Sequence, residues 1–372
     1  MRSPKALHII SQNTRSFTID LIDAAPAIQA ECEKLGYKAV FHEVEGEEFS
    51  GFSGNVDVRA ALVLGYSEHF LRRIVSVLKQ DDVHPIIVGN DTDIVGCSSL
   101  SFDRRKAVLN VIDYYRQNGR SNTALFGINP NASSDLQRKA AFTKKLGDKA
   151  ESAIFFNNGS LQQAAKEFLK TVNAFDSVIC ANDMAAAVLI REAHRIGLLL
   201  PDDLFICGSG NTYLAEHTLP TLTSVSLDYS EVGRSAVQLY DFLEGMPSHS
   251  CARFTVDSII HIRESTATLP FSPQHTETYL SSDFSAKLNF VNDSDVVALD
   301  HINRALSKCD DIDLAILSKG YQGISRSDIA FELYIGETTL RYRLEKICRA
   351  ADCKDSTELF ALLRQFDIQI NR

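Results

Sequence analysis

The sequence has no apolar run that approaches the ~18 residues needed to cross a membrane as a helix. Its basic start contains only a short apolar patch at 6–10, whereas a secretory signal needs a longer apolar core and a small-residue cleavage site. We interpret 7–10 as a first strand. We therefore expect a protein that stays in the cytoplasm and does not contact a membrane.

None of the eight cysteines forms a CxxC pair, and they are scattered through mostly apolar segments. Cys348 and Cys353 lack the further Cys or His spacing of a zinc site. The sequence therefore indicates reduced, buried thiols, and we expect no metal and no cofactor.

There is no surplus of positive charge: the formal net charge is −10 at pH 7, which argues against nucleic-acid binding by the surface as a whole. A local patch is not excluded, because 337–349 carries a small net positive charge. With 372 residues, 45 % of them apolar and 23 % charged, the chain fits two or three compact, soluble units.

Short β-rich runs alternate with helix-length amphipathic segments from 5 to 265. Apolar strands separated by helices are typical of parallel sheets covered on both faces. We therefore expect an α/β fold with two doubly wound subdomains. The predicted strands are 5–10, 38–42, 60–64, 85–88, 123–127, 153–156, 177–180, 204–207 and 254–262, and the predicted helices include 19–35, 104–118, 161–172 and 184–196.

Polar turns follow several of these strands, and in doubly wound sheets the ligand lies beyond the carboxyl ends of the strands. Their Ser, Asn, Asp and Gly residues suit a polar ligand, although ordinary loop chemistry explains any single turn equally well. The turns are 11–16, 65–67, 89–93, 181–183 and 208–211.

Residues 5–265 resemble the ligand-binding core of the lactose-repressor/galactose-repressor (LacI/GalR) family, which is built like a periplasmic sugar-binding protein. The resemblance rests on the order and spacing of AECEKLGY, HPIIVGN, SLSFDRRKAV, LQRKAAFTKKL, VICANDMAAAVLIREAHRIGLLLPDDL and LTSVSLDYSEVGRSAVQLYDFL. It implies a small-molecule sensor.

The resemblance implies ligand contacts at Asp103, Arg138 and Asn182, and aromatic stacking by Tyr229. Carboxylate, guanidinium and amide groups suit a hydroxyl-rich ligand. We expect Asp183 to cap a helix that starts at Met184 rather than to bind ligand. The full set of predicted ligand-binding residues is Asn13, Phe17, Asn90, Asp103, Arg138, Asn182, Asn211 and Tyr229.

Three departures from the family argue against a typical sugar as the ligand. Residues 208–211 read Gly-Ser-Gly-Asn where sugar-binding members have an acidic residue. Leu227 replaces a polar contact of some relatives, and Gly159 lies about where the lactose repressor has a bulky aromatic residue. The glycines do not complete a nucleotide-binding fingerprint.

We expect that the family's usual N-terminal DNA-binding helices are missing, and the last part of the chain resembles a LuxR-type helix-turn-helix over ~55 residues. Ser325 and Asp328 have capping-box spacing, and Gly336 suits the N-cap of the next helix. The expected domains are a sensor at 1–265, a linker at 266–292 and a DNA-binding unit at 293–372. The helices expected in that unit are 293–306, 312–317, 325–333, 337–349 and 356–365.

In the expected recognition helix, Leu340, Leu344 and Ile347 share one face and should be buried. The opposite face could meet bases and phosphates in a major groove. A charged, solvated face on a dimerisation bundle is the alternative. The predicted DNA-binding residues are Thr338, Arg341, Tyr342, Glu345, Lys346 and Arg349.

The sequence thus predicts a homodimeric transcription regulator whose partners are DNA and a small-molecule effector. An alternative is a cytoplasmic binding module whose helical unit docks on protein. An enzyme is the third possibility, since 90–93 is similar to the acidic clusters of nucleoside hydrolases. We expect no enzyme, because the chain offers no paired nucleophile and base and no metal-ligand spacing.

Overall fold

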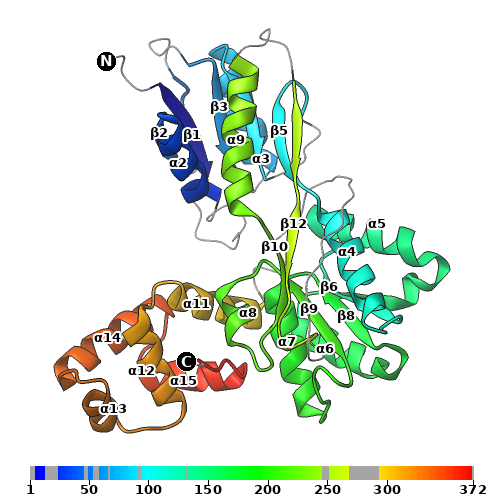
Figure 1. The fold of residues 1–372 in the computed structure, drawn as a ribbon, viewed down its shortest axis with the longest axis vertical. Coiled ribbons are helices and arrows are strands. Elements are labelled where there is room, and N and C mark those ends of the chain that lie inside the picture. Colours follow the sequence, from blue (N-terminus) through cyan, green and yellow to red (C-terminus); the bar gives the residue numbers. More distant parts are fainter. Residues whose placement is uncertain are drawn as a thin grey trace.

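Two sheets, each covered on both faces by helices, form most of the computed structural model (Figure 1). The structure describes residues 5–12, 24–45, 49–52, 58–65, 68–89, 94–130, 132–244, 251–267 and 293–370.

The first sheet is built from β1 Ala6–Gln12, β2 Lys38–Val44, β3 Ala60–Leu64, β4 His84–Val88, β5 Ser98–Phe102 and β11 Arg253–Val256. Its order is β11-β5-β4-β3-β1-β2, and every pairing between these described strands is parallel. Its covering helices are α2 Ala24–Leu35, α3 Glu68–Gln80 and α9 Tyr229–Glu244.

Successive residues of β3 enter opposite sides of this sheet. Leu62 joins the apolar cluster under α2 and α9, whereas Val63 joins the cluster under α3. Burial on both faces explains why the parallel strands read as continuous apolar runs. Gly233 of α9 lets α2 approach, since a Cβ there would lie 2.4 Å from the carbonyl oxygen of Ala27.

The second sheet is built from β6 Thr123–Ile128, β7 Ile154–Phe156, β8 Ser177–Cys180, β9 Phe205–Ser209, β10 Thr223–Leu227 and β12 Ser258–His261. Its order is β12-β10-β9-β8-β6-β7, and only β12 runs antiparallel among the described strands. The helices α4 Arg104–Gln117 and α5 Ser133–Leu146 cover one face. The other face is covered by α6 Leu161–Leu169, α7 Asp183–Arg195 and α8 Tyr213–His217.

The chain passes between the two sheets after β5, after β10 and between β11 and β12. Single residues bridge these crossings: Asp103 begins α4, Asp228 precedes α9, and Asp257 separates β11 from β12. The ammonium group of Lys106 forms an ion pair with Asp257, although the Lys106 side chain is only 2 % exposed. This buried cation ties α4 to the last crossing.

The C-terminal helices form a helical unit, here called the head, which comprises residues 293–370 and packs on the second subdomain (Figure 1). Helix α11 packs on α6, α7 and α8, and its Leu299 and Ile302 belong to the same apolar cluster as Phe126 of the second sheet. Phe366 and Ile368, which follow the last helix, return to that cluster. The head and the second subdomain therefore share one continuous core. The helices of the head are α11 Ser294–Leu306, α12 Asp311–Tyr321, α13 Arg326–Glu332, α14 Glu337–Ala350 and α15 Ser356–Gln365.

The predicted fold class, two doubly wound α/β subdomains followed by helices, is confirmed. The prediction of one strand over 254–262 is wrong, because the segment splits at Asp257 and serves both sheets. Strands β5 and β10 were not predicted, since their serines interrupt the apolar pattern. The domain boundaries stay a prediction, and most of the expected linker lies outside the described residues.

Candidate functional site

Polar residues follow the strands of the second sheet at the edge that faces the first sheet, here called the carboxyl edge. Strand β10 leaves this edge to enter the first subdomain, and β6, β8 and β9 run parallel to it. Asn129, Asn182 and Gly210 therefore follow their strands at the same edge. The carboxyl ends of both sheets face each other, which is the arrangement that favours a ligand between subdomains.

Arg138 joins two parts of this edge. Its guanidinium donates to Asp135 Oδ1 at 2.7 Å and to the hydroxyl of Ser209, at the end of β9, at 3.2 Å. Asp135 Oδ2 accepts a hydrogen bond from the backbone N–H of Asn129 at 3.0 Å. Burial raises the pKa of Asp135, and the charge of Arg138 opposes that rise. The predicted ligand contact Arg138 is therefore held in place by an acid that the sequence analysis missed.

Asp103 has a structural task at the first crossing. Its Oδ1 accepts a hydrogen bond from the backbone N–H of Lys106 at 2.9 Å and caps α4, and the residue is 3 % exposed. Arg104 is close enough to Asp135 to lower that carboxyl's pKa. The role of Asp103 as a ligand contact stays a prediction.

The prediction that Asp183 caps α7 is wrong, because Asn182 is the cap and Asp183 is the first helical residue. Asn182 Oδ1 accepts from the backbone N–H of Ala185 at 2.9 Å. The fully buried Asp183 accepts from the N–H of Thr212 at 2.7 Å and from the Ser224 hydroxyl at 2.5 Å. Burial raises its pKa, and these hydrogen bonds oppose the rise. In the sequence, the only sign of this role is that Asp183 is an acidic residue directly after the capping residue Asn182.

Asp183 also explains the glycines at the end of β9. A Cβ on Gly208 would lie 2.3 Å from Asp183 Oδ1, which no relaxed structure allows. Gly210 adopts φ 121°, a conformation reserved for glycine. The Gly-Ser-Gly sequence that departs from sugar-binding relatives thus lets the turn close over a buried carboxylate.

Two other predicted contacts face different surroundings. Asn211 Oδ1 accepts from the Arg263 guanidinium at 2.7 Å, so its side-chain oxygen is held by the residues after β12. Tyr229 begins α9 and packs against the apolar cluster of the first subdomain. Asn13, Phe17 and Asn90 lie outside the described residues.

The head contains two consecutive helices in a helix-turn-helix order. Ser325 caps α13 by accepting from the N–H of Asp328 at 3.2 Å, and Gly336 is the N-cap of α14, as predicted. The predicted inner face of α14 is also confirmed, since Leu340, Leu344 and Ile347 are 1 %, 5 % and 2 % exposed.

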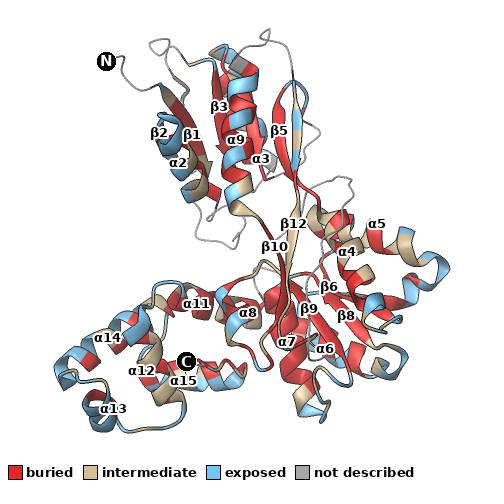
Figure 2. Ribbon diagram, viewed as in Figure 1, coloured by how far each residue is buried: buried red, intermediate tan, exposed pale blue. Residues whose placement is uncertain are grey.

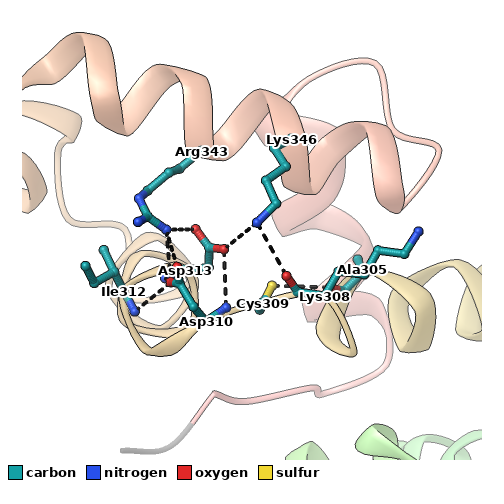
Figure 3. A network of polar contacts seen from close by, with 8 residues as sticks. All are labelled: Ala305, Lys308, Cys309, Asp310, Ile312, Asp313, Arg343 and Lys346. Carbon is teal, nitrogen blue, oxygen red and sulfur yellow. Dashed lines mark hydrogen bonds and ion pairs between the residues drawn. The ribbon is translucent and has the colours of Figure 1, made fainter. Parts of the chain in front are cut away.

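The predicted DNA-binding residues of α14 are all solvent-exposed, and Figure 2 colours much of α14 as exposed. Lys346 nevertheless departs from the prediction of an outward cation. Its ammonium lies 3.2 Å from Asp313 Oδ2 and donates to the carbonyl of Lys308 at 3.4 Å (Figure 3). The neighbouring Arg343 binds both Asp310 and Asp313. These two cations fasten α14 to α12 through the fully buried Asp313.

Two large aromatic residues near the turn were missed. Phe331 is 80 % exposed and Tyr334 is 95 % exposed, and Tyr342 on α14 is 69 % exposed. Tyr334 has φ 53°, a left-handed conformation that is strained for a bulky side chain. The sequence sign that could have pointed to Tyr334 is a tyrosine placed between two apolar residues, Leu333 and Ile335.

Within the described ranges, no group of three or more His, Cys, Asp or Glu side chains could hold a metal ion. No described helix is long and apolar enough to cross a membrane.

Residues 112–266 match the periplasmic binding protein-like domain family. The chain is 24 % identical over 217 residues to the NTD biosynthesis operon regulator NtdR of Bacillus subtilis, covering 55 % of this chain and 64 % of NtdR. The chain thus spans less than two thirds of that relative.

Solved structures of transcription regulators share the fold. A regulator from Lactobacillus plantarum superposes with a TM-score of 0.56 at 22 % identity, covering 71 % of this chain and 100 % of that one. A LacI family regulator from Enterococcus faecium with bound ribose gives 0.54 at 18 % identity, with 71 % and 100 % coverage. The family match ends at residue 266, before the head, so the resemblance of the head to a LuxR-type unit stays a prediction.

Proposed function

We propose that the chain is a ligand-responsive transcription regulator. In this proposal a small polar metabolite binds between the two subdomains, and the head binds duplex DNA through α14. The observation that carries the proposal is α7, which begins at the carboxyl edge and ends against the head. Asn182 caps its first turn, and Arg191, near its last turn, pairs with Asp295 of the head.

The chemistry of the carboxyl edge supports a hydroxyl-rich or amide-bearing effector. Arg138 supplies guanidinium donors, Asn182 offers an amide group, and Asp103 supplies a carboxylate at the first crossing between the subdomains. Relatives of the same fold are regulators, and one of them was solved with ribose. Glycines at 208 and 210 instead of an acid favour an effector with fewer hydroxyl donors than a sugar.

Helix α7 gives the effector a route to the head. All of its residues from Asp183 to Ala193 are buried, and at 1.5 Å per residue it spans about 20 Å (Figure 2). Asp183 binds the turn after β9, so a shift of that turn moves the start of the helix. When the effector closes the two subdomains on each other, the second subdomain would move, and the head would move with it as one body.

In a homodimer, a change in subdomain angle alters the distance between paired heads. DNA half-sites are separated by a fixed helical repeat, so such a change moves the heads into or out of register. Dimerisation is therefore part of the proposal.

A protein-binding head is the second candidate. The exposed Phe331 and Tyr334 favour it, because large exposed aromatics are typical of protein interfaces. It predicts a head that captures protein but enriches no DNA sequence.

The test is selection of DNA fragments by the purified full-length protein, followed by affinity measurement on the enriched sequence. Arg341→Ala should weaken binding at least tenfold, whereas the matched control Arg116→Ala, an exposed arginine of α4, should leave it unchanged. Absence of any enriched sequence, or equal affinity of Arg341→Ala and the natural protein, contradicts the proposal.

The effector is sought by a thermal-shift screen of sugars, nucleosides and other small metabolites, because a ligand that binds the native state stabilises it. A true effector should stabilise the natural protein but not Arg138→Ala. The control is Lys144→Ala, which changes an exposed residue of the same helix, α5, and should be stabilised like the natural protein. It should also change the affinity for the enriched DNA.

A further inference from the structure

The head has a groove of about 630 Å³ between the start of α13, the second half of α14 and the start of α15. Four cationic side chains line it: Arg326 of α13, Arg341 and Arg349 of α14, and Lys354 of the turn before α15. Only Arg341 and Arg349 were predicted to meet DNA.

These cations differ from those on the opposite flank of α14. There, Arg343 and Lys346 are neutralised by Asp310 and Asp313 (Figure 3). In the groove, Arg341 has only a 3.9 Å approach to Glu345. Arg349 and Lys354 form no ion pair with any residue that the structure describes, and both are exposed. The charge available to an outside anion therefore lies on the groove side.

The acids of the groove are only partly available to oppose that charge. Asp355 accepts from the backbone N–H groups of Thr357 at 2.8 Å and Glu358 at 3.0 Å and caps α15. Its negative charge therefore already interacts with the positive N-terminal end of α15. Asp352 is exposed at the rim, and Glu345 faces Arg341.

One cation is held ready by the fold. The guanidinium of Arg326 donates to the Ser356 hydroxyl at 2.7 Å, so a residue at the start of α13 is fixed to the start of α15. A guanidinium has further donors in its planar fork, and such forks match phosphate oxygens. Arg326 can therefore bind an anion with little loss of side-chain freedom.

We propose that this groove binds the phosphodiester backbone of duplex DNA, beside the bases that the outer face of α14 contacts. The inference rests on the proposed function and assigns Arg326, Arg349 and Lys354 to the backbone. Arg341 lines the groove and also borders the exposed Tyr342, so it lies between the two surfaces. The groove would fix the register of α14 on DNA without contributing sequence preference.

The experiment measures affinity of the full-length protein for two duplexes, the enriched sequence and a random one, between about 50 and 200 mM salt. Removing one phosphate contact lowers the slope of log affinity against log salt by about 0.9 and weakens binding about five- to tenfold near 0.1 M salt. Arg349→Gln and Lys354→Gln should each lower the salt slope and weaken binding in this way, and by the same factor on both duplexes. Lys308→Gln, an exposed head cation outside this groove, should change neither.

A variant that should strengthen DNA binding distinguishes the proposal from a loss of affinity caused by misfolding. Asp352 has φ 52°, which asparagine also tolerates, so Asp352→Asn removes a rim charge without new strain. It should tighten binding to both duplexes severalfold. If the natural protein binds DNA but all three variants keep its slope and affinity, the groove assignment is overturned and the proposed function stands. If the natural protein binds neither duplex, both fail.

Discussion

The Arg191 guanidinium in α7 lies 2.8 Å from the Asp295 carboxylate in the first turn of α11. It also contacts Glu192 and lies 4.8 Å from the ring centre of Phe366, which follows α15. One side chain therefore ties both ends of the head to a helix of the second subdomain.

Arg191→Met should destabilise the junction strongly. Arg191 and Asp295 are 3 % and 13 % exposed, so removing the cation leaves the largely buried Asp295 carboxylate without its ion-pair partner, whereas Glu192 keeps Arg195. The expected loss is about 3 kcal/mol, measured by urea denaturation. Arg195→Met is the control: Arg195 pairs with Glu192 but is 52 % exposed, and its loss should be below about 1 kcal/mol. Equal losses in both variants would contradict a special role for Arg191.

Gly208→Ala should disturb the carboxyl edge. The new Cβ would lie 2.3 Å from Asp183 Oδ1 and 2.9 Å from a methyl of Leu222, so the turn must shift. We expect a loss of about 1–3 kcal/mol and loss of effector-induced stabilisation. Gly336→Ala is the control, because a Cβ there meets nothing closer than 3.9 Å. Undiminished effector binding in Gly208→Ala would show that the turn does not shape the ligand site.

The sequence predicted the sheet-and-helix order because apolar runs and helix-stop glycines are local signals. Gly36, Gly119 and Gly197 follow helices with φ values of 76°, 77° and 82°, the left-handed conformation that ends a helix and that glycine favours. Strands β5 and β10 escaped, because serine reads as a turn residue. Some of their serines bond to partners far away in the sequence, as Ser224 does to Asp183 and Ser101 to the carbonyl of Phe254.

Pairings between distant residues account for what the site prediction missed. The N-cap Asn182 was assigned to ligand and the buried Asp183 to the cap, because only the folded turn at 208–212 shows which side chain turns inward. The sequence predicted Lys346 as an outward cation, but in the fold α12 places Asp313 next to its ammonium group. The direction of a long side chain depends on neighbours that no local pattern contains.

Acid should destabilise the first subdomain through His8 and His42. Their rings stack with Nδ1 of His8 2.9 Å from Nε2 of His42. Burial lowers the pKa of both rings below the ordinary 6.5, and for His8 the charge of His42 adds to this. The folded state therefore binds fewer protons than the unfolded chain. Stability from this source is complete above pH 6.5 and declines as the pH falls below it.

The measurement is urea denaturation at pH 8 and at a pH well below 6.5. His42→Gln should lose less stability between the two pH values than the natural protein does. His69→Gln, a variant of an exposed histidine in α3, should behave like the natural protein. An acid-induced loss unaltered in His42→Gln would exclude the pair as its source.

Tyr334→Asn should separate stability from function in the head. Tyr334 is 95 % exposed, so it contributes almost no burial to the fold, and its φ of 53° strains a bulky residue. Asparagine adopts this conformation more readily, so the variant should gain about 1 kcal/mol of stability in urea denaturation.

Because Tyr334 strains the fold and is 95 % exposed, we expect its side chain to contact an outside partner. If that partner is DNA, Tyr334→Asn should weaken DNA binding while the head grows more stable. If the partner is protein, DNA affinity should stay unchanged and only protein capture should fall. Phe331→Ser, a change at the neighbouring 80 %-exposed aromatic, should follow the same direction as Tyr334→Asn in whichever assay responds. Unchanged binding to both DNA and protein in the two variants would refute a partner-binding role for this aromatic surface.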